Sequence, residues 1–188
     1  EIMPSLVGSE MCIRDRDLGM EVVRADAFAM GEVNVSSSMV RACLAEGEVG
    51  IAARCLTRPY EITGRVVHGF HVGHELGFPT ANIQVEDSQK LIPKNGVYAV
   101  WVKGKIGGEE HVWGGMLNIG LRPTMENGEN RTIEVHLLDF AGDLYGCRLT
   151  LSFVRRLRDE RKFRNKGELV HQLREDEAMV RMILNKEQ

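Results

Sequence analysis

The stretch GRVVHGFHVGHELGFPTAN, residues 64–82, decides how the middle of the chain can fold. Three of its glycines are spaced four residues apart and allow the backbone a flexible arch: Gly69, Gly73 and Gly77. Pro79 disfavours helical geometry at Phe78 and has no N–H to donate, so a helix cannot begin here and continue. The stretch therefore predicts a strand that runs into a glycine-rich loop, with a rigid Phe78-Pro79 step that positions Thr80 and Asn82.

The same stretch contains HVGH, His71–His74, which fits the H-x-G-H pattern with which nucleotidyltransferases bind ATP. That chemistry needs the histidines where a strand meets a helix, because the helix N-terminus then faces the phosphates. The glycine and proline after His74 oppose such a helix. A loop that brings the backbone close to a polyphosphate fits better, and the Thr80 hydroxyl and Asn82 carbonyl are hard oxygen ligands of the kind that Mg²⁺ prefers. From the residues alone, a glycine-rich hairpin without a ligand stays open as the alternative.

Length and composition limit the class of protein. The chain has 188 residues, a formal net charge of -3 and 43% hydrophobic residues, which fits one domain of about 100 to 200 residues plus an appendage. Apolar runs are shorter than the roughly 18 residues that span a bilayer, and no secretory signal pattern opens the chain. The cysteines are scattered without a C-x-x-C pair: Cys12, Cys43, Cys55 and Cys147. We expect a cytoplasmic protein with reduced thiols and with neither a membrane nor a nucleic acid as its partner.

The first residues do not match the rest of the chain. The segment MCIRDR, Met11–Arg16, can be encoded by a DNA sequence that looks like the transposon-end adaptor used in preparing sequencing libraries. We expect residues 1–16 to be a non-native sequence artefact, with the natural chain continuing upstream with other residues. An ordinary disordered tail is the alternative.

Residues 17–57 contain too few predicted elements to form a complete domain. Met20–Ala25 has the apolar content of a short strand, and Ser36–Ser38 are good N-caps for a helix that Gly47 ends. Val49–Leu56 predicts a second short helix. Two helices and one strand make a poor core, so we expect this segment to pack on another part of the protein.

From residue 58 the pattern changes to alternating runs separated by glycine-rich connections. The predicted strands are Tyr60–Val67, Gly96–Val102, Val112–Asn118, Thr132–Phe140 and Arg148–Phe153. Because no helix of crossover length separates these runs, they predict an antiparallel sheet that closes into a barrel. Residues 166–188 predict a helix with one apolar stripe that packs on the barrel wall: Leu169, Leu173, Val180, Ile183 and Leu184.

Two features of this half carry possible chemistry. Ile133, Val135 and Leu137 share one face of a strand, which turns Glu134 to the other face, where a carboxylate can act as a base or be an ordinary solvated residue. A basic run spans Arg155–Lys166; such runs are usually solvated faces, and less often bind nucleic acid.

Six segments in this order resemble one family: GRVVHGFHVGHELGFPTANI, LIPKNGVYAV, NIGLRPT, RTIEVHLLDF, LYG and LRDERKF. They are similar to the riboflavin kinase module of bacterial bifunctional riboflavin kinase/FAD synthetases, over about residues 58–182. VNVSSSMVRACLAEGEV resembles the end of the adenylyltransferase module, most of which is missing. On this resemblance GFPTAN is the functional element and HVGH is a coincidence.

The resemblance implies a mainly β fold, with a six-stranded antiparallel barrel and a C-terminal helix after a short α-rich remnant. It implies three regions: the artefact at 1–16, the adenylyltransferase remnant at 17–57, and the kinase barrel with its helix at 58–188. The implied activity is transfer of the γ-phosphate of ATP to the ribityl 5′-hydroxyl of riboflavin, which gives FMN and ADP. FAD synthesis is expected only in the full-length parent.

The resemblance also implies roles for individual residues. Glu134 matches the catalytic carboxylate, and Thr80 and Asn82 match the positions that hold Mg²⁺. The nucleotide and phosphates are assigned to Gly69, Gly73, Gly77, Pro79, Thr80 and Asn82. The flavin is assigned to Arg158 as first choice, then Arg161, together with Asn118. Arg122 and Thr124 match a loop near the ligands, and His74 stands where many relatives have Arg. A non-catalytic flavin- or nucleotide-binding barrel is the alternative function.

Overall fold

The computed structural model describes residues 29–30, 33–69, 76–123 and 129–186. The chain divides into two compact units, residues 1–35 and 36–188. In the first unit, β1 (Ala29–Met30) pairs antiparallel with β2 (Val33–Asn34). The strand expected at Met20–Ala25 and the artefact expected at 1–16 lie outside the described residues.

The second unit begins with the two predicted helices. In α2 (Ser37–Glu46), the Ser36 side chain accepts a hydrogen bond from the Met39 N–H at 3.2 Å. Gly47 ends this helix with a φ of 79°, a left-handed conformation that glycine adopts without strain. After it, α3 spans Val49–Leu56. Both helices are confirmed at their predicted positions.

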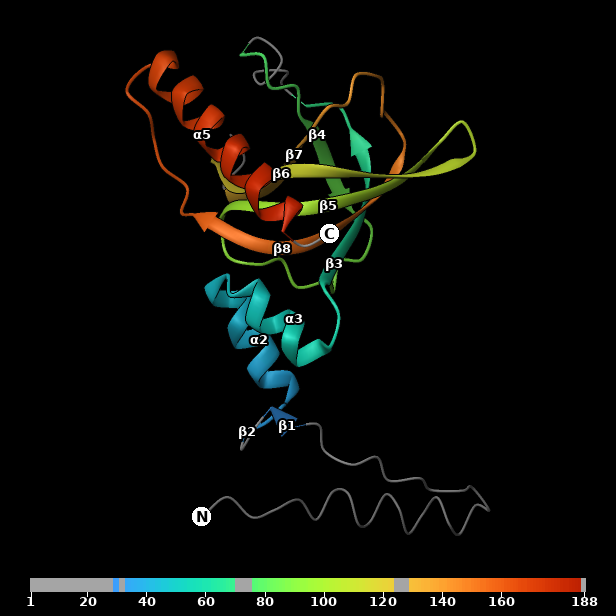
Figure 1. The fold of residues 1–188 in the computed structure, drawn as a ribbon, viewed down its shortest axis with the longest axis vertical. Helices are drawn as coiled ribbons and strands as arrows, with labels where there is room; N and C mark the ends of the chain where they lie inside the picture. Colours follow the sequence, from blue (N-terminus) through green and yellow to red (C-terminus); the bar gives the residue numbers. More distant parts are fainter. Residues whose placement is uncertain (1–28, 31–32, 70–75, 124–128, 187–188) are drawn as a thin grey trace. The chain divides into compact units, whose positions relative to one another are not determined.

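A closed barrel of six antiparallel strands comes next, in the order β3-β4-β7-β6-β5-β8 (Figure 1). Its strands are β3 (Tyr60–Val67), β4 (Ala81–Val85), β5 (Gly96–Ile106), β6 (Glu109–Pro123), β7 (Glu129–Leu137) and β8 (Arg148–Arg158). The predicted barrel is confirmed.

The strands β5, β6 and β8 extend beyond their predicted bounds, and β7 begins earlier than predicted. Two further details differ from the expectation. The alternating pattern did not predict β4, which has only five residues and begins directly after Thr80. The strand predicted to reach Phe140 ends at Leu137, because Asp139 has a φ of 56° and turns the chain.

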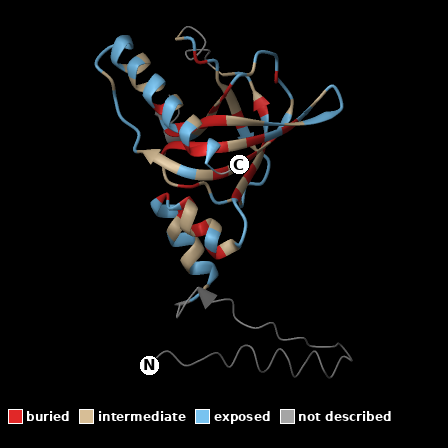
Figure 2. Ribbon diagram, in the orientation of Figure 1, coloured by how far each residue is buried: buried red, intermediate tan, exposed pale blue. Residues whose placement is uncertain are grey.

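The barrel interior is one hydrophobic cluster that the two helices share. Leu44 and Val49 belong to the same cluster as Tyr60 and Phe153 of the barrel. Figure 2 shows buried residues along the strands and on the sides of α2 and α3 that face them. The two helices thus pack on the barrel, whereas the domain boundary at residues 57 and 58 stays a prediction.

The last helix, α5 (Lys166–Asn185), covers part of the outer barrel surface. It begins at Asn165, whose side chain accepts a hydrogen bond from the Glu168 N–H at 2.9 Å. A second cluster joins β5 and β6 to this helix: Val97, Ala99, Met116, Val180, Ile183 and Leu184. The other two residues of the predicted stripe, Leu169 and Leu173, are only partly buried, because they line a cleft.

Candidate active site

Five side chains form one row across the outside of the barrel. In antiparallel strands, residues directly opposite each other present their side chains on the same face. Asn82 on β4 lies opposite Glu134 on β7, which lies opposite Asn118 on β6. The row continues through Val97 on β5 to Arg158 on β8. The register therefore gathers the predicted base, one predicted metal ligand and two predicted flavin contacts on one surface.

The GFPTAN loop is attached to this row by contacts with β7. The Thr80 Oγ1 donates to Glu134 Oε2 at 3.4 Å, a long hydrogen bond. His136 Nδ1 lies 2.8 Å from the Pro79 carbonyl oxygen and must be the donor, because a carbonyl only accepts. The Phe78 and His136 rings meet edge to face, with centroids 5.4 Å apart. The loop thus holds Thr80 against the carboxylate of Glu134.

The structure shows why two of the three predicted loop positions require glycine. A Cβ at Gly69 would lie 2.0 Å from Asn82 Nδ2, so any side chain there must displace the Asn82 amide. Gly77 has a φ of 81°, which other residues rarely adopt. Gly73 and His74 lie outside the described residues, as do Thr124 and the side chain of Arg122.

Four residues of the row, all but Asn82, line a cleft of about 400 Å³. Glu134 and Asn118 line it from the barrel, and the segment after β8 supplies Arg158, Arg161 and Phe163. The N-terminal half of α5 closes it with the apolar Leu169 and Leu173. Such a cleft, mostly apolar with a few polar groups at one end, is typical of a small-molecule site.

The two predicted flavin-binding arginines have different surroundings. Arg158 donates from Nε and Nη2 to both oxygens of Asp176, at 2.7 to 3.1 Å, and from Nη1 to the Asp159 carbonyl at 2.9 Å. Arg161 lies over the Phe163 ring, 4.7 Å from its centroid, with no ion pair among the described residues. Arg158 therefore has its donors engaged, and Arg161 is the freer of the two.

Asp176 is the residue of this site that the sequence analysis missed. It is only 4% exposed, and Gln172 also donates to it, at 2.9 Å. Its sequence signal was its position: it falls between Leu173 and Val180 on the apolar stripe of α5. A carboxylate on a buried stripe indicates a charged partner in the facing element.

A second cleft, of about 490 Å³, lies on the other side of Thr80. Thr80 lines both clefts, whereas Pro79, Ala81 and Tyr145 line only the second. The Tyr145 ring stacks on the His68 ring, with centroids 4.0 Å apart and planes inclined by 25°. Thr80 is therefore the point at which molecules in the two clefts could meet.

Known proteins share sequence and fold with this chain. The family model of flavokinases, described as riboflavin kinase, matches residues 56–184. The chain belongs to the riboflavin kinase family. The predicted resemblance is thereby confirmed.

Curated relatives match most of the chain. A bifunctional riboflavin kinase/FMN adenylyltransferase from Pseudomonas fluorescens is 41% identical over 165 residues, which are 88% of this chain and 51% of the relative. The protein of the same name from Bacillus subtilis (strain 168) is 41% identical over 144 residues, covering 76% of this chain and 44% of the relative. The chain thus spans about half the length of these relatives.

Solved structures share the fold. A riboflavin kinase from Trypanosoma brucei has a TM-score of 0.53 at 27% identity, covering 68% of this chain and 81% of its own. A structure described as a macrolide-efflux protein from Streptococcus pneumoniae has a TM-score of 0.76 at 32% identity, covering 89% of this chain and 54% of its own. Among the described residues, no helix has the length and apolar character needed to cross a membrane.

Proposed function

We propose that this chain is a riboflavin kinase that transfers the γ-phosphate of ATP to the ribityl 5′-hydroxyl of riboflavin. The observation that supports it most directly is the position of Thr80, which lines both clefts and contacts Glu134. Riboflavin in one cleft and ATP in the other would bring the acceptor hydroxyl and the γ-phosphate together at that residue. Membership of the family gives the choice of substrates.

In this proposal riboflavin occupies the cleft over the row. The flavin ring lies against the apolar wall formed by Phe163, Leu169 and Leu173, and Arg161 and Asn118 contact its polar edge. The ribityl chain points to Glu134. The carboxylate takes the proton of the 5′-hydroxyl as that oxygen bonds to the γ-phosphorus, and the bond from phosphorus to the β,γ-bridging oxygen breaks to release ADP. A well-placed base of this kind contributes roughly 10²- to 10⁴-fold in rate.

The nucleotide occupies the second cleft. Its base lies at the Tyr145 and His68 rings, and its phosphates extend along the glycine-rich loop toward Thr80. The oxygens of Thr80 and Asn82 fit Mg²⁺, which takes few ligands from protein and the rest from phosphate and water. When bound, the ion neutralises charge on the transferred phosphoryl group. The Asn82 amide occupies the space that a Cβ at residue 69 would fill, so Gly69 leaves room for it.

The test is to incubate the purified chain with riboflavin, ATP and Mg²⁺ and to separate riboflavin, FMN and FAD by chromatography. We expect FMN only when the metal is present, and at least a hundredfold slower formation in Glu134→Gln. Glu109→Gln is the matched control, because Glu109 is an exposed strand carboxylate that lines neither cleft. Equal rates in both variants would remove Glu134 from the role of base.

The alternative is a flavin- or nucleotide-binding barrel without catalysis. Riboflavin that binds but gives no FMN under these conditions would favour it. FAD formation is not expected from this chain, and FAD among the products would contradict that expectation. A cytoplasmic location remains part of the proposal.

A further inference from the structure

A third cleft, of about 670 Å³, lies away from the proposed kinase site. It is bounded by α3, by β8 and by the C-terminal end of α5. None of its described lining residues also lines either cleft beside Thr80. Whatever binds here therefore does not compete directly with riboflavin or ATP.

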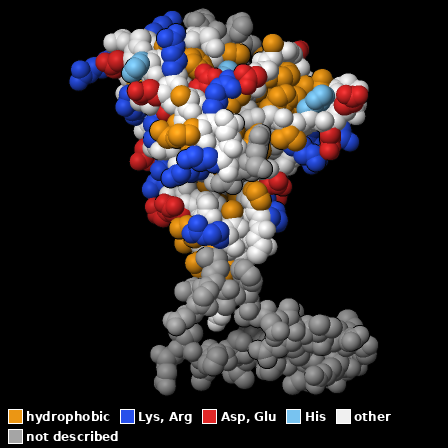
Figure 3. Space-filling view, viewed as in Figure 1, with side chains coloured by type: hydrophobic (Ala, Val, Ile, Leu, Met, Phe, Trp, Pro, Cys, Tyr) orange, Lys and Arg blue, Asp and Glu red, His pale blue; other side chains and the backbone are white. Residues whose placement is uncertain are grey.

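The lining carries an excess of positive charge. Arg54, Arg155, Arg156 and Lys186 converge on the cleft from three elements, and Glu48 is the acidic residue among the described lining. Arg54, Arg155 and Lys186 have no ion pair in the part of the chain that the structure describes. Figure 3 shows basic side chains over both α3 and β8 on one face. In a chain with a net charge of -3, this is a local concentration of uncompensated cations.

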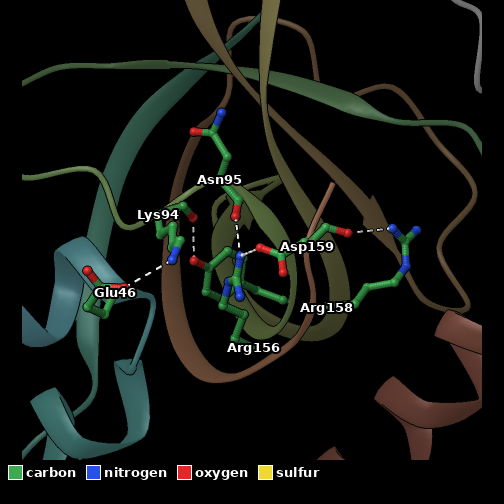
Figure 4. Close-up of polar contacts among 7 residues, drawn as sticks. Glu46, Lys94, Asn95, Arg156, Arg158 and Asp159 are labelled. Atoms are coloured by element: carbon green, nitrogen blue, oxygen red, sulfur yellow. Dashed lines mark hydrogen bonds and ion pairs between the residues drawn. The ribbon is translucent and has the colours of Figure 1, made fainter. Parts of the chain in front are cut away.

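Arg156 lines the cleft, and polar contacts with neighbouring residues fix its side chain (Figure 4). Its Nη2 donates to the Asn95 carbonyl at 2.5 Å and to Asp159 Oδ1 at 2.6 Å, and its guanidinium lies 5.9 Å from the centroid of the Tyr98 ring. The Tyr98 hydroxyl in turn donates to the Lys94 carbonyl. The Arg156 Nε is buried and has no hydrogen-bond partner among the residues that the structure describes. These contacts hold the Arg156 guanidinium in place beside the cleft.

The remaining lining determines the class of ligand. Val49, Ile51, Val154 and Leu157 give the cleft apolar surface beside the cations. Guanidinium groups match the geometry of phosphate oxygens, and the apolar surface suits a flat ring. We propose that this cleft is a second binding site, for a nucleoside phosphate. The proposal does not depend on the kinase activity.

The experiment is an amide NMR titration of the full ¹⁵N-labelled chain with ADP in the absence of Mg²⁺. We expect saturable shifts for residues 49–54 and 154–157, distinct from any shifts at 80–82. Inorganic pyrophosphate should move the same amides with weaker affinity, because it lacks the ring. Adenosine should not move them, because it lacks the charge. Shifts confined to the amides around Thr80 would overturn the proposal.

Charge-reversal variants complete the test. Arg54→Glu combined with Arg155→Glu should weaken ADP binding at residues 49–54 and 154–157 at least tenfold. Lys105→Glu makes one such charge reversal on an exposed strand residue that lines none of the three clefts, and should have no effect. If the double Glu variant does not fold, Arg54→Gln with Arg155→Gln tests the same contacts. Unchanged affinity in the folded double variant contradicts a phosphate site here.

Discussion

At the residue scale, His136 is positioned to hold the GFPTAN loop. It lies two residues after Glu134 on the outer face of β7, and contacts both Phe78 and Pro79. Since Thr80 comes directly after Pro79, this contact sets the distance between the Thr80 hydroxyl and the Glu134 carboxylate. His136 is thus a positioning residue in the proposed reaction.

We expect His136→Phe to keep the ring contact and to lose the hydrogen bond to the Pro79 carbonyl. The net loss of one such bond is about 1 kcal/mol, so kcat/KM for ATP should fall about fivefold to tenfold, while KM for riboflavin changes little. Steady-state FMN formation measures both. His111→Phe is the matched control on β6, and His136→Gln, which restores a donor, should recover part of the loss. Equal losses for both substrates would indicate a general structural role.

Gly69 is the second residue whose role is set by one contact. In Gly69→Ala the new Cβ would lie 2.0 Å from the Asn82 amide, so Asn82 must move. We expect at least a tenfold rise in the Mg²⁺ concentration needed for half-maximal FMN formation. Gly50→Ala is the control, because its nearest neighbour to a Cβ is at an ordinary 3.9 Å. An unchanged Mg²⁺ requirement in Gly69→Ala would remove Asn82 from the metal site.

At the scale of elements, α5 is attached to the barrel by its apolar stripe and by ion pairs that include Asp176 with Arg158 and Arg181 with Asp139. Asp176 is buried against Arg158 of β8, where the two side chains are 5% and 21% exposed. Asp176→Asn removes the charge and leaves the guanidinium partly buried without its partner. We expect a loss of about 3 kcal/mol in the free energy of unfolding, measured by urea titration. Replacing the pair together, as Arg158→Met with Asp176→Leu, should recover most of this stability; no recovery would show that packing around the pair matters more.

The other ion pair of α5 predicts a pH dependence. Hydrogen bonds from Arg181 hold the pKa of Asp139 below its ordinary value. Because the folded pKa is lowered, the stabilisation is present above the unfolded pKa of about 3.9 and is lost as the pH falls through the folded value. The melting temperature should therefore drop between pH 5 and pH 3, and less steeply in Asp139→Asn. Asn tolerates the positive φ at residue 139, so the substitution does not strain the backbone. If the melting temperatures of both proteins fall in parallel, other carboxyl groups cause the fall.

At the scale of the whole described unit, the two helices α2 and α3 belong to the core of the barrel. Leu44 is 2% exposed and lies in the same cluster as Phe153. We expect Leu44→Ala to cost about 2 to 5 kcal/mol and to lower the stability of the entire unit in one transition. Leu91→Ala, at a leucine that is 43% exposed, should cost far less. A separate early transition in Leu44→Ala would instead support a domain boundary at residues 57 and 58.

Local sequence determined much of this protein. Alternating apolar residues predicted five of the six barrel strands, Ser36 and Gly47 marked the ends of α2, and Pro79 excluded a helix after HVGH. These are short-range effects of backbone geometry and side-chain periodicity, so they can be read without knowing the fold. The positions of Thr80, Asn82 and Glu134 were assigned from the family resemblance.

Tertiary structure alone decided how these parts meet. The strand β4 was not predicted because five residues carry too little periodicity, and it forms by pairing with β3 and β7. The row from Asn82 to Arg158 depends on strand register, which is set by packing between segments distant in the chain. Likewise, Asp176 takes the donors of Arg158 only because α5 lies against β8. Long-range packing is absent from any local pattern, so these features required the folded molecule.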